Sequence, residues 1–330
     1  MSQVSEPRVV DRTTPPVGAR VRTTPGWPKA LWWVGTLLLG VMVFHLIALA
    51  VTGGAWNGPV SLRKPATFAE TGWLAAWSTA LILTVVRTRP WQRNVIGAAV
   101  ALFGIIETTV MGIQAWRGVP SHYNFSTPFD AALVRVGAAG TAAVFLFGMV
   151  VLLVVTLRSA QTPAPVRLGI GAAVVVTLVA CVIGLVMIFN NSGVYQGTIG
   201  AGFGRTGGYL GPDAATVGRQ YLLIRPATAG GDLVLPHAIG VHGLILLAAP
   251  AVLLARTAAG SRLQLRTIAE AVGAVAVALA ILIVHAARQL PLDRLSLLAL
   301  VALAVCGIAL VHSYVVIALA LLARRRPGAA

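Results

Sequence analysis

The stretch Gly230-Gly231-Asp232-Leu233-Val234-Leu235-Pro236-His237-Ala238-Ile239-Gly240-Val241-His242-Gly243 passes from a polar loop into a long apolar run. It places His237 and His242 where that run begins. Ionisable side chains are costly at bilayer depth and usually face a protein interior or a water-filled cavity. The stretch therefore indicates a membrane helix whose mouth carries polar chemistry, and most other ionisable groups near bilayer depth fall at the same level.

The composition is typical of a polytopic membrane protein. Of the 330 residues, 57% are hydrophobic and 10% are charged, and the mean hydropathy is +0.85. The formal net charge of +16 comes from Lys and Arg between apolar runs, where they set orientation and meet the headgroups of a lipid bilayer. No basic patch is interleaved with aromatics, so we expect no nucleic-acid partner. Cys181 and Cys306 lie inside apolar runs and imply no disulfide framework.

Eight apolar runs each approach the ~20 residues that a helix needs to cross a ~30 Å hydrocarbon core. They are 31–52, 66–86, 95–116, 132–157, 168–189, 237–255, 267–287 and 295–323. The pattern predicts an all-α bundle of about eight transmembrane helices over 30–323, with a long Gly-rich loop at 190–236. Residues 1–29 lack an apolar period, which predicts a disordered tail, and 324–330 form a basic tail. The first run is too long for a cleaved signal peptide and is interpreted as a retained anchor.

The distribution of positive charge predicts the orientation. Of the 25 Lys and Arg residues, 16 lie in the N-terminal tail, the second, fourth and sixth connections and the C-terminal tail, and 9 lie on the opposite side. Cytoplasmic loops carry the excess of Lys and Arg. We therefore expect a multi-pass plasma-membrane protein with both termini in the cytoplasm and 190–236 outside.

Polar side chains gather on the expected outer side. Five of the six histidines lie there, and His312 lies in the inner half of the last run. The five are His45, His122, His237, His242 and His285.

Carboxylates and an amide lie at similar depth. Glu70 lies at the outer end of the second run, Glu107 past the middle of the third, and Gln114 at its outer end. Glu107, Met111 and Gln114 follow i, i+4, i+7 spacing and so share one helix face. An intramembrane carboxylate can couple proton movement to cargo, so Glu107 is a candidate for transport.

The outer loops supply the remaining candidates: Arg117, His122, Asn124 and Asp232. Arg117 and His122 suit an anionic headgroup or substrate, although an interfacial Arg often only snorkels. Gly200-Ala201-Gly202-Phe203-Gly204 lacks the flanking strand and helix of a dinucleotide fingerprint, so we expect no nucleotide. A loop this long favours a lid or a re-entrant segment.

Three motifs carry a resemblance: Lys64-Pro65…Phe68, Arg117-Gly118…Ser121-His122…Asn124…Thr127-Pro128, and Gly231-Asp232-Leu233…Pro236-His237…Gly240…His242. They resemble a family of uncharacterised bacterial multi-pass membrane proteins over about residues 30–255. The family's third outer loop tends to hold a further His and an Asp-Gly-Gly, from which this chain departs. The resemblance implies topology and site location, and no activity or cofactor.

The histidines leave several kinds of cofactor open. His237 and His242 lie ~140° apart around a regular helix and ~7.5 Å along it, so they cannot chelate one ion as an i, i+4 pair would. Facing histidines from different helices suit haem b, with His45, His242 and His285 as candidates. A His/Glu set, His237, His242 and Glu107, suits zinc or copper.

The functional hypotheses are a metal- or haem-binding redox component with an outward-facing site, a proton-coupled small-solute transporter, and a structural protein whose polar groups bond one another. No catalytic residue is identified. Glu107 and His242 are expected to share one outer site, because isolated polar groups in lipid are expensive. Glu270 is expected to pair with Arg266, four residues before it.

Overall fold

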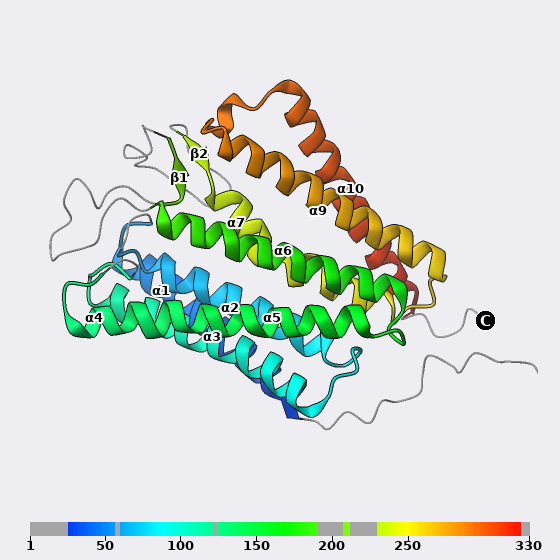
Figure 1. The fold of residues 1–330 in the computed structure, drawn as a ribbon, viewed down its shortest axis with the longest axis horizontal. Helices are drawn as coiled ribbons and strands as arrows, with labels where there is room; N and C mark the ends of the chain where they lie inside the picture. The colour runs from blue at the N-terminus through cyan, green and yellow to red at the C-terminus, as the bar shows by residue number, and fades with distance from the viewer. Residues whose placement is uncertain (1–25, 57–59, 122–123, 191–206, 212–229, 325–330) are drawn as a thin grey trace, which may run out of the picture.

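The computed structural model describes residues 26–56, 60–121, 124–190, 207–211 and 230–324, and it is almost entirely helical (Figure 1). His122 and most of the expected loop at 190–236 lie outside the described residues. The long helices are α1 (Gly26–Thr52), α2 (Arg63–Ile82), α3 (Pro90–Trp116), α5 (Thr141–Arg158), α6 (Ala164–Phe189), α9 (Ser261–Ala287) and α10 (Leu297–Arg324). The shorter elements are α4 (Pro128–Ala132), the π-helix η1 (Leu133–Gly140), α7 (Val234–Val241), the π-helix η3 (Leu244–Ala248), α8 (Ala249–Leu254), the 3-10 turn η4 (Leu292–Arg294), β1 (Tyr209–Leu210) and β2 (Gly231–Asp232).

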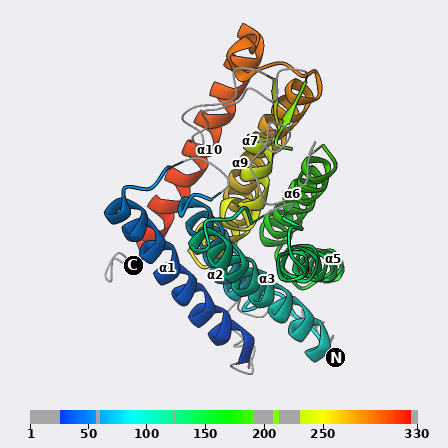
Figure 2. The same ribbon diagram turned by 90° about the vertical axis from the view of Figure 1, so that its left-hand side faces the viewer.

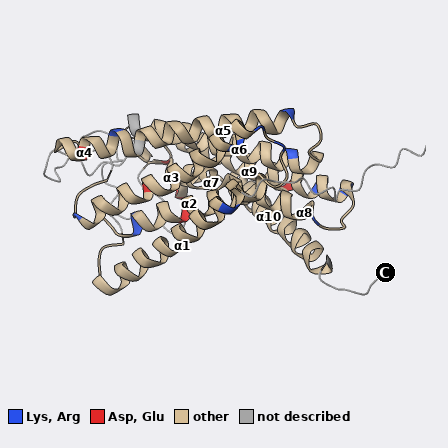
Figure 3. Ribbon diagram, turned by 90° about the horizontal axis from the view of Figure 1, so that it is seen from below, with Lys and Arg blue, Asp and Glu red and all other residues tan. Residues whose placement is uncertain are grey.

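The all-α prediction is confirmed, and each apolar run of the sequence coincides with a helix or a chain of helices. Among the described residues, six helices are long and apolar enough to cross a membrane: α1, α3, the continuous helix from Pro128 to Arg158, α6, α9 and α10. The bent pair of α7 with η3–α8 makes a seventh if it is counted as one span. In Figure 3 the helices carry no charged residue over most of their length.

The helix α2 is not among these six; it begins with Arg63 and Lys64 and contains Glu70, and it is less apolar than they are. It packs between α1 and α3, and small residues make this possible. A Cβ added to Gly72 would lie 2.9 Å from the Cα of Gly104 in α3, so the two backbones are in direct contact. Such close approach is how helices associate in lipid, where no hydrophobic force draws them together.

The chain bends by 48° between α7 and the η3–α8 segment. Gly240 and Gly243 let this region press against α6, because a Cβ at either position would lie within 2.7 Å of an atom of that helix. Farther along, Pro250 has no N–H to offer to the carbonyl of Leu246. Tyr314 of α10 donates its hydroxyl hydrogen to that carbonyl at 2.8 Å, which ties α10 to the broken helix.

The apolar core lies among α2, α3, α5, α6, η3 and α9, where Phe103 of α3 stacks on Phe145 of α5 with ring centroids 4.4 Å apart. The two end helices are different. Only 22% of the most apolar part of α1 and 17% of that of α10 is buried. Both helices lie at the edge of the bundle (Figure 2) and present apolar side chains outward.

The two short strands pair antiparallel beside the end of α9, with Tyr209 opposite Asp232. A Cβ on Gly231 would lie 2.1 Å from the carbonyl oxygen of Ala286, so only glycine permits this contact. Tyr209 is buried, and burial raises the pKa of its phenol well above the ordinary value. This ladder fixes the entry of the chain into α7.

Candidate functional site

A buried carboxylate organises the junction between α3 and α4. Asp130 is 1% exposed, and its Oδ1 accepts hydrogen bonds from Arg117 Nη1 at 2.5 Å and Gln114 Nε2 at 2.8 Å. Its Oδ2 accepts from the hydroxyls of Thr127 at 2.6 Å and Ser126 at 3.3 Å. Charge-assisted bonds of this kind are stronger than neutral ones. The junction is therefore held by one fully ligated anion.

Asp130 was not among the residues predicted for the site, although its local sequence carries a signal. Thr127 precedes α4, its Oγ1 accepts from the backbone N–H of Asp130 at 3.1 Å, and the carboxylate accepts from the same hydroxyl. A Thr followed three residues later by an acidic residue is a helix-start signature. The long-range contacts from α3 could not be read from that signature.

The predicted residues Arg117, Gln114 and Asn124 all lie at this junction. Arg117 pairs with Asp130 and stacks over Phe129, with its guanidinium carbon 5.0 Å from the ring centroid. Asn124 is fully buried and accepts from Ser126 through its Oδ1, while its Nδ2 has no partner among the described residues. These three side chains lie together where α3 ends and α4 begins.

Glu107 lies deeper in α3, 4% exposed, and faces the start of α5. Met111 and Gln114 on the same face are also buried, which confirms the predicted helix face. The Oε1 of Glu107 is 3.1 Å from the hydroxyl of Thr141, and its Oε2 is buried without a hydrogen-bond partner among the described residues. Lys64, at the start of α2, interacts electrostatically with this carboxyl group.

The Thr141 hydroxyl lies between two acceptors. It bonds the carbonyl of Gly137 in the π-helix η1 as well as Glu107. A hydroxyl carries one hydrogen and two lone pairs. If that hydrogen goes to Gly137, the bond to Glu107 requires a proton on the carboxyl group itself. The hydrogen bonds around Thr141 are therefore compatible with a protonated, neutral carboxyl group on Glu107.

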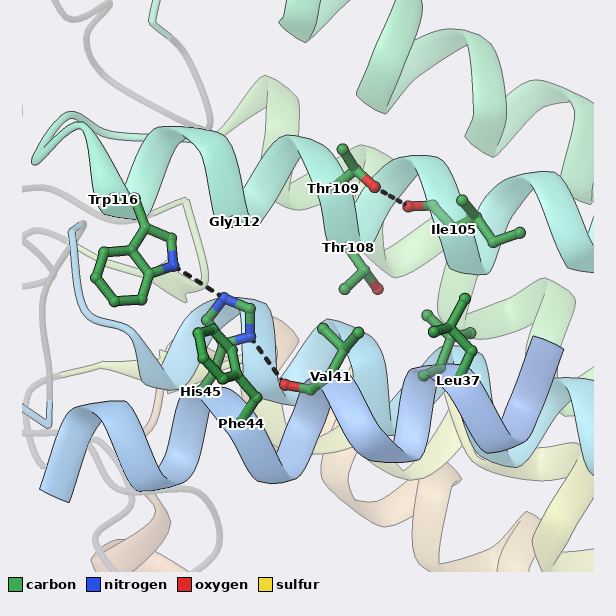
Figure 4. A pocket seen from close by; sticks show the side chains of 10 residues that line it. Leu37, Val41, Phe44, His45, Ile105, Thr108, Thr109, Gly112 and Trp116 are labelled. Atoms are coloured by element: carbon green, nitrogen blue, oxygen red, sulfur yellow. Dashed lines mark hydrogen bonds between the residues drawn. The ribbon is translucent and has the colours of Figure 1, made fainter. Parts of the chain in front are cut away.

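His45 of α1 has both ring nitrogens engaged. Trp116 Nε1 donates to His45 Nε2 at 3.2 Å, so the ring hydrogen is on Nδ1, which donates to the carbonyl of Val41 at 2.9 Å. Figure 4 shows the two rings at one end of a groove of about 260 Å³ between α1 and α3. An axial haem ligand needs a free nitrogen, so His45 would have to break this arrangement to serve as one.

His237, His242 and His285 each bond a different backbone carbonyl. His237 Nδ1 bonds the carbonyl of Ala180 at 2.8 Å, and His285 Nε2 bonds that of Pro291 at 2.8 Å. His242 lies at the bend between α7 and η3, where its Nδ1 bonds the carbonyl of Ala238 at 2.6 Å. Its Nε2 is buried, with no hydrogen-bond partner in the described part of the chain.

No group of three or more His, Cys, Asp and Glu side chains among the described residues is placed to hold a metal ion. The set of His237, His242 and Glu107 thus gains no support. Glu107 contacts Thr141 and His242 contacts Ala238, so a common site for Glu107 and His242 stays a prediction.

The other two predicted residues in the described part of the chain are Asp232 and Glu70. Asp232 accepts from the backbone N–H groups of Val234 at 2.7 Å and Leu235 at 3.0 Å, which satisfies the first turn of α7. Glu70 is half-buried on α2.

The expected pair of Glu270 with Arg266 is replaced by a pair between two helices. His312 Nδ1 of α10 lies 2.9 and 3.0 Å from the two carboxylate oxygens of Glu270 in α9. Arg266 lies one turn nearer to the helix start and is exposed, so water can solvate its guanidinium group without an ion pair.

Comparison with models of protein families, with curated proteins and with solved structures finds no match to this chain.

Proposed function

We propose that this chain is a proton-coupled transporter of a small solute, with Glu107 as the group that takes up and releases the proton. The single observation that carries the proposal is the buried Glu107 carboxyl, whose Oε2 has no partner among the described residues and whose Oε1 shares the Thr141 hydroxyl with a π-helical carbonyl. A buried ionisable group in a membrane helix marks an ion or substrate pathway by default.

The backbone around Glu107 supports this role. The π-helix η1 adjoins Thr141, and a second π-helix, η3, follows the bend at His242. Single π-turns are frequent at functional sites, and transporters bind substrate where membrane helices are broken. In the proposed cycle a proton adds to a carboxylate oxygen of Glu107, the solute binds, and the same proton leaves to the other side.

The transport proposal assumes a topology of eight membrane spans in the plasma membrane, with both termini cytoplasmic. It counts α2 as a span, because α2 is as long as one and is shielded from lipid by α1 and α3. It places Glu107, nine residues before the end of α3, roughly 14 Å below the outer end of that helix.

A haem or metal redox component is the weaker alternative, because no group of three or more His, Cys, Asp and Glu side chains among the described residues is placed to hold a metal ion, and both ring nitrogens of His45 are already engaged. An absorbance spectrum and elemental analysis of the purified protein decide this. A Soret band, or bound zinc or copper in stoichiometric amount, would favour that alternative.

The transport proposal is tested in two stages with Glu107→Gln and, as the matched control, Glu70→Gln. Infrared spectra between pH 5 and 9 should show a protonated carboxyl band that only Glu107→Gln removes. Liposomes containing a pH-sensitive dye should then report proton entry when one of a panel of amino acids, sugars, monocarboxylates or amines is added outside. Proton entry that no solute elicits, or that survives Glu107→Gln, would overturn the proposal.

A further inference from the structure

A lysine lies near the carboxyl group of Glu107. Lys64 is one of the two lysines of the chain, and it is half-buried at the start of α2. The contact between Gly72 and Gly104 fixes how α2 and α3 align. Counted from that contact toward the end where α2 begins and α3 ends, the Cα of Lys64 lies roughly 7 Å beyond that of Glu107. The flexible four-carbon stem of a lysine covers most of this distance.

The Lys64 ammonium group and the Glu107 carboxyl group attract each other without a direct bond. The two interact electrostatically, but within the described ranges no ion pair or hydrogen bond joins the ammonium to a carboxylate. The buried Oε2 of Glu107 is likewise without a partner there. An ammonium group has three hydrogens to donate, and a protonated carboxyl group has one. Both groups can therefore donate to the same third group.

Lys64 is the charged group that acts on Glu107. Other titratable side chains lie at this end of α3 and of the elements that pack against it: His45, Arg63, Glu70, Arg117, Asp130 and Arg135. In the part of the chain that the structure describes, the electrostatic partner of Glu107 is Lys64 and not one of these. The charge state of this position therefore depends on one ammonium group and one carboxyl group.

Charge balance at this position selects a class of solute, because a net charge buried between helices is costly. With Glu107 ionised, its charge cancels that of Lys64, and no charged solute is favoured. With Glu107 protonated, the ammonium charge remains, and one negative charge restores neutrality. A dianion or an amine would leave a net charge, and a neutral sugar would leave the ammonium group without a counter-ion.

We infer that the transported solute is a small monocarboxylate, bound as its anion between the Lys64 ammonium group and the protonated carboxyl group of Glu107. The inference rests on the proposed function and names its substrate class. A carboxylate has two acceptor oxygens: one accepts from the ammonium group and the other accepts the carboxyl hydrogen of Glu107. When that proton leaves, the Glu107 carboxylate again balances Lys64 and repels the bound anion. Proton and anion therefore cross together in equal number.

Isothermal titration calorimetry of the full chain in lipid nanodiscs tests the inference, with propionate as the probe at pH 6 and pH 8. Propionamide and propylamine are the neutral and cationic analogues of similar shape, and chloride is the monoanion without two oxygens. We expect propionate to bind more tightly than all three. Repeating the titration in buffers of different ionisation enthalpy measures proton uptake, and binding that takes up a proton is tighter at pH 6 than at pH 8.

The decisive variant is Lys64→Gln, with Lys29→Gln, exposed at the start of α1, as its matched control. Lys64→Gln should weaken propionate binding about 30-fold or more, as expected when one partner of a desolvated charge pair is removed. Lys29→Gln should leave it unchanged. Glu107→Gln keeps a hydrogen-bond donor, so it should bind propionate equally at both pH values and without proton uptake.

Thermal unfolding of each variant identifies misfolding. If Lys64→Gln does not fold, lysine acetylation of the unmodified chain, read by mass spectrometry, replaces it: propionate should protect Lys64 and not Lys29.

The outcomes separate this inference from the proposed function. The inference is overturned if the unmodified chain does not bind propionate, if chloride binds as tightly, if Lys64→Gln binds as Lys29→Gln does, or if propionate fails to protect Lys64. Proton entry into liposomes that a sugar or an amine elicits, and propionate does not, would leave the proposed function standing and overturn the monocarboxylate. Propionate binding through Lys64 with no proton uptake at either pH would uphold the anion site and overturn the proton coupling.

Discussion

Removal of the Arg117 guanidinium should leave the buried Asp130 carboxylate without its positively charged partner. In Arg117→Met the apolar stem is kept, while the guanidinium charge and its contact over the Phe129 ring are lost. Breaking a buried pair by removing one partner costs roughly 3–5 kcal/mol, because an uncompensated charge is left behind. Arg117 itself is 39% exposed, and Gln114 and Thr127 still donate to the carboxylate, which favours the lower end of that range.

Protonation of Asp130 limits this loss of stability, because the folded variant can bind a proton instead of keeping an unpaired charge. An ordinary aspartate has a pKa of about 3.9, so protonating it costs about 4 kcal/mol at pH 7 and about 1.5 kcal/mol at pH 5. The variant should therefore lose about 3 kcal/mol relative to the unmodified chain at pH 7 and no more than about 1.5 kcal/mol at pH 5. The sign follows from linkage: the native variant binds a proton that its unfolded form releases, so its stability falls as pH rises.

The free energy of unfolding is measured by titrating SDS into the protein in mild detergent, with tryptophan fluorescence as the signal, at both pH values. The control is Arg288→Met, which removes an exposed arginine from the end of α9 and should change stability by less than about 0.5 kcal/mol. Equal losses for Arg117→Met and Arg288→Met at pH 7 would refute the reasoning. A loss that does not shrink at pH 5 would show that the charge of Asp130 is not its source.

Three further predictions concern packing and topology. Trp116→Phe should leave His45 Nε2 without its donor and cost about 1–3 kcal/mol in unfolding measurements, whereas the exposed Trp91→Phe should cost almost nothing. Gly240→Ala should lower the free energy of unfolding by about 1–3 kcal/mol, because its Cβ would lie 2.5 Å from that of Ala180. Gly40→Ala is the control, and equal stability of the two variants would contradict the close packing of α7 on α6. In a chain without native cysteines, Ser296→Cys should react with an impermeant thiol reagent in intact cells, and Ser261→Cys only after permeabilisation; the reverse pattern would invert the proposed orientation.

The helices could be predicted because their signal is local. Runs of about 20 apolar residues predict membrane helices without knowledge of their neighbours, and the i, i+4, i+7 spacing predicted the buried face of Glu107. The bend near His242 was not predicted. It depends on the way Gly240 and Gly243 press against α6, and that contact joins segments far apart in the sequence.

The sequence predicted where the polar side chains gather, but not the hydrogen-bond partner of each one. The sequence indicated that histidines lie near the outer side, but not which carbonyl each ring would meet, because Ala180 and Pro291 carry no distinguishing side chain. The same holds for Glu270: Arg266 was visible as a neighbour on one helix, whereas His312, 42 residues away, becomes a neighbour only when α9 and α10 pack. Asp130 was missed because its importance depends on four donors from two segments, the end of α3 and the residues just before α4, which meet only in the folded chain.

The polar start of α2 has a consequence for how the protein enters the membrane. In the eight-span arrangement, a segment with Arg63, Lys64 and Glu70 partitions poorly into lipid by itself, because each such charge opposes insertion. The contact between Gly72 and Gly104 supplies a solution, since α2 can leave the translocon already packed between α1 and α3. The helices α1, α2 and α3 would then enter the membrane as one unit. Gly104, in the middle of α3, would determine how much of the protein inserts with α2 in its correct place.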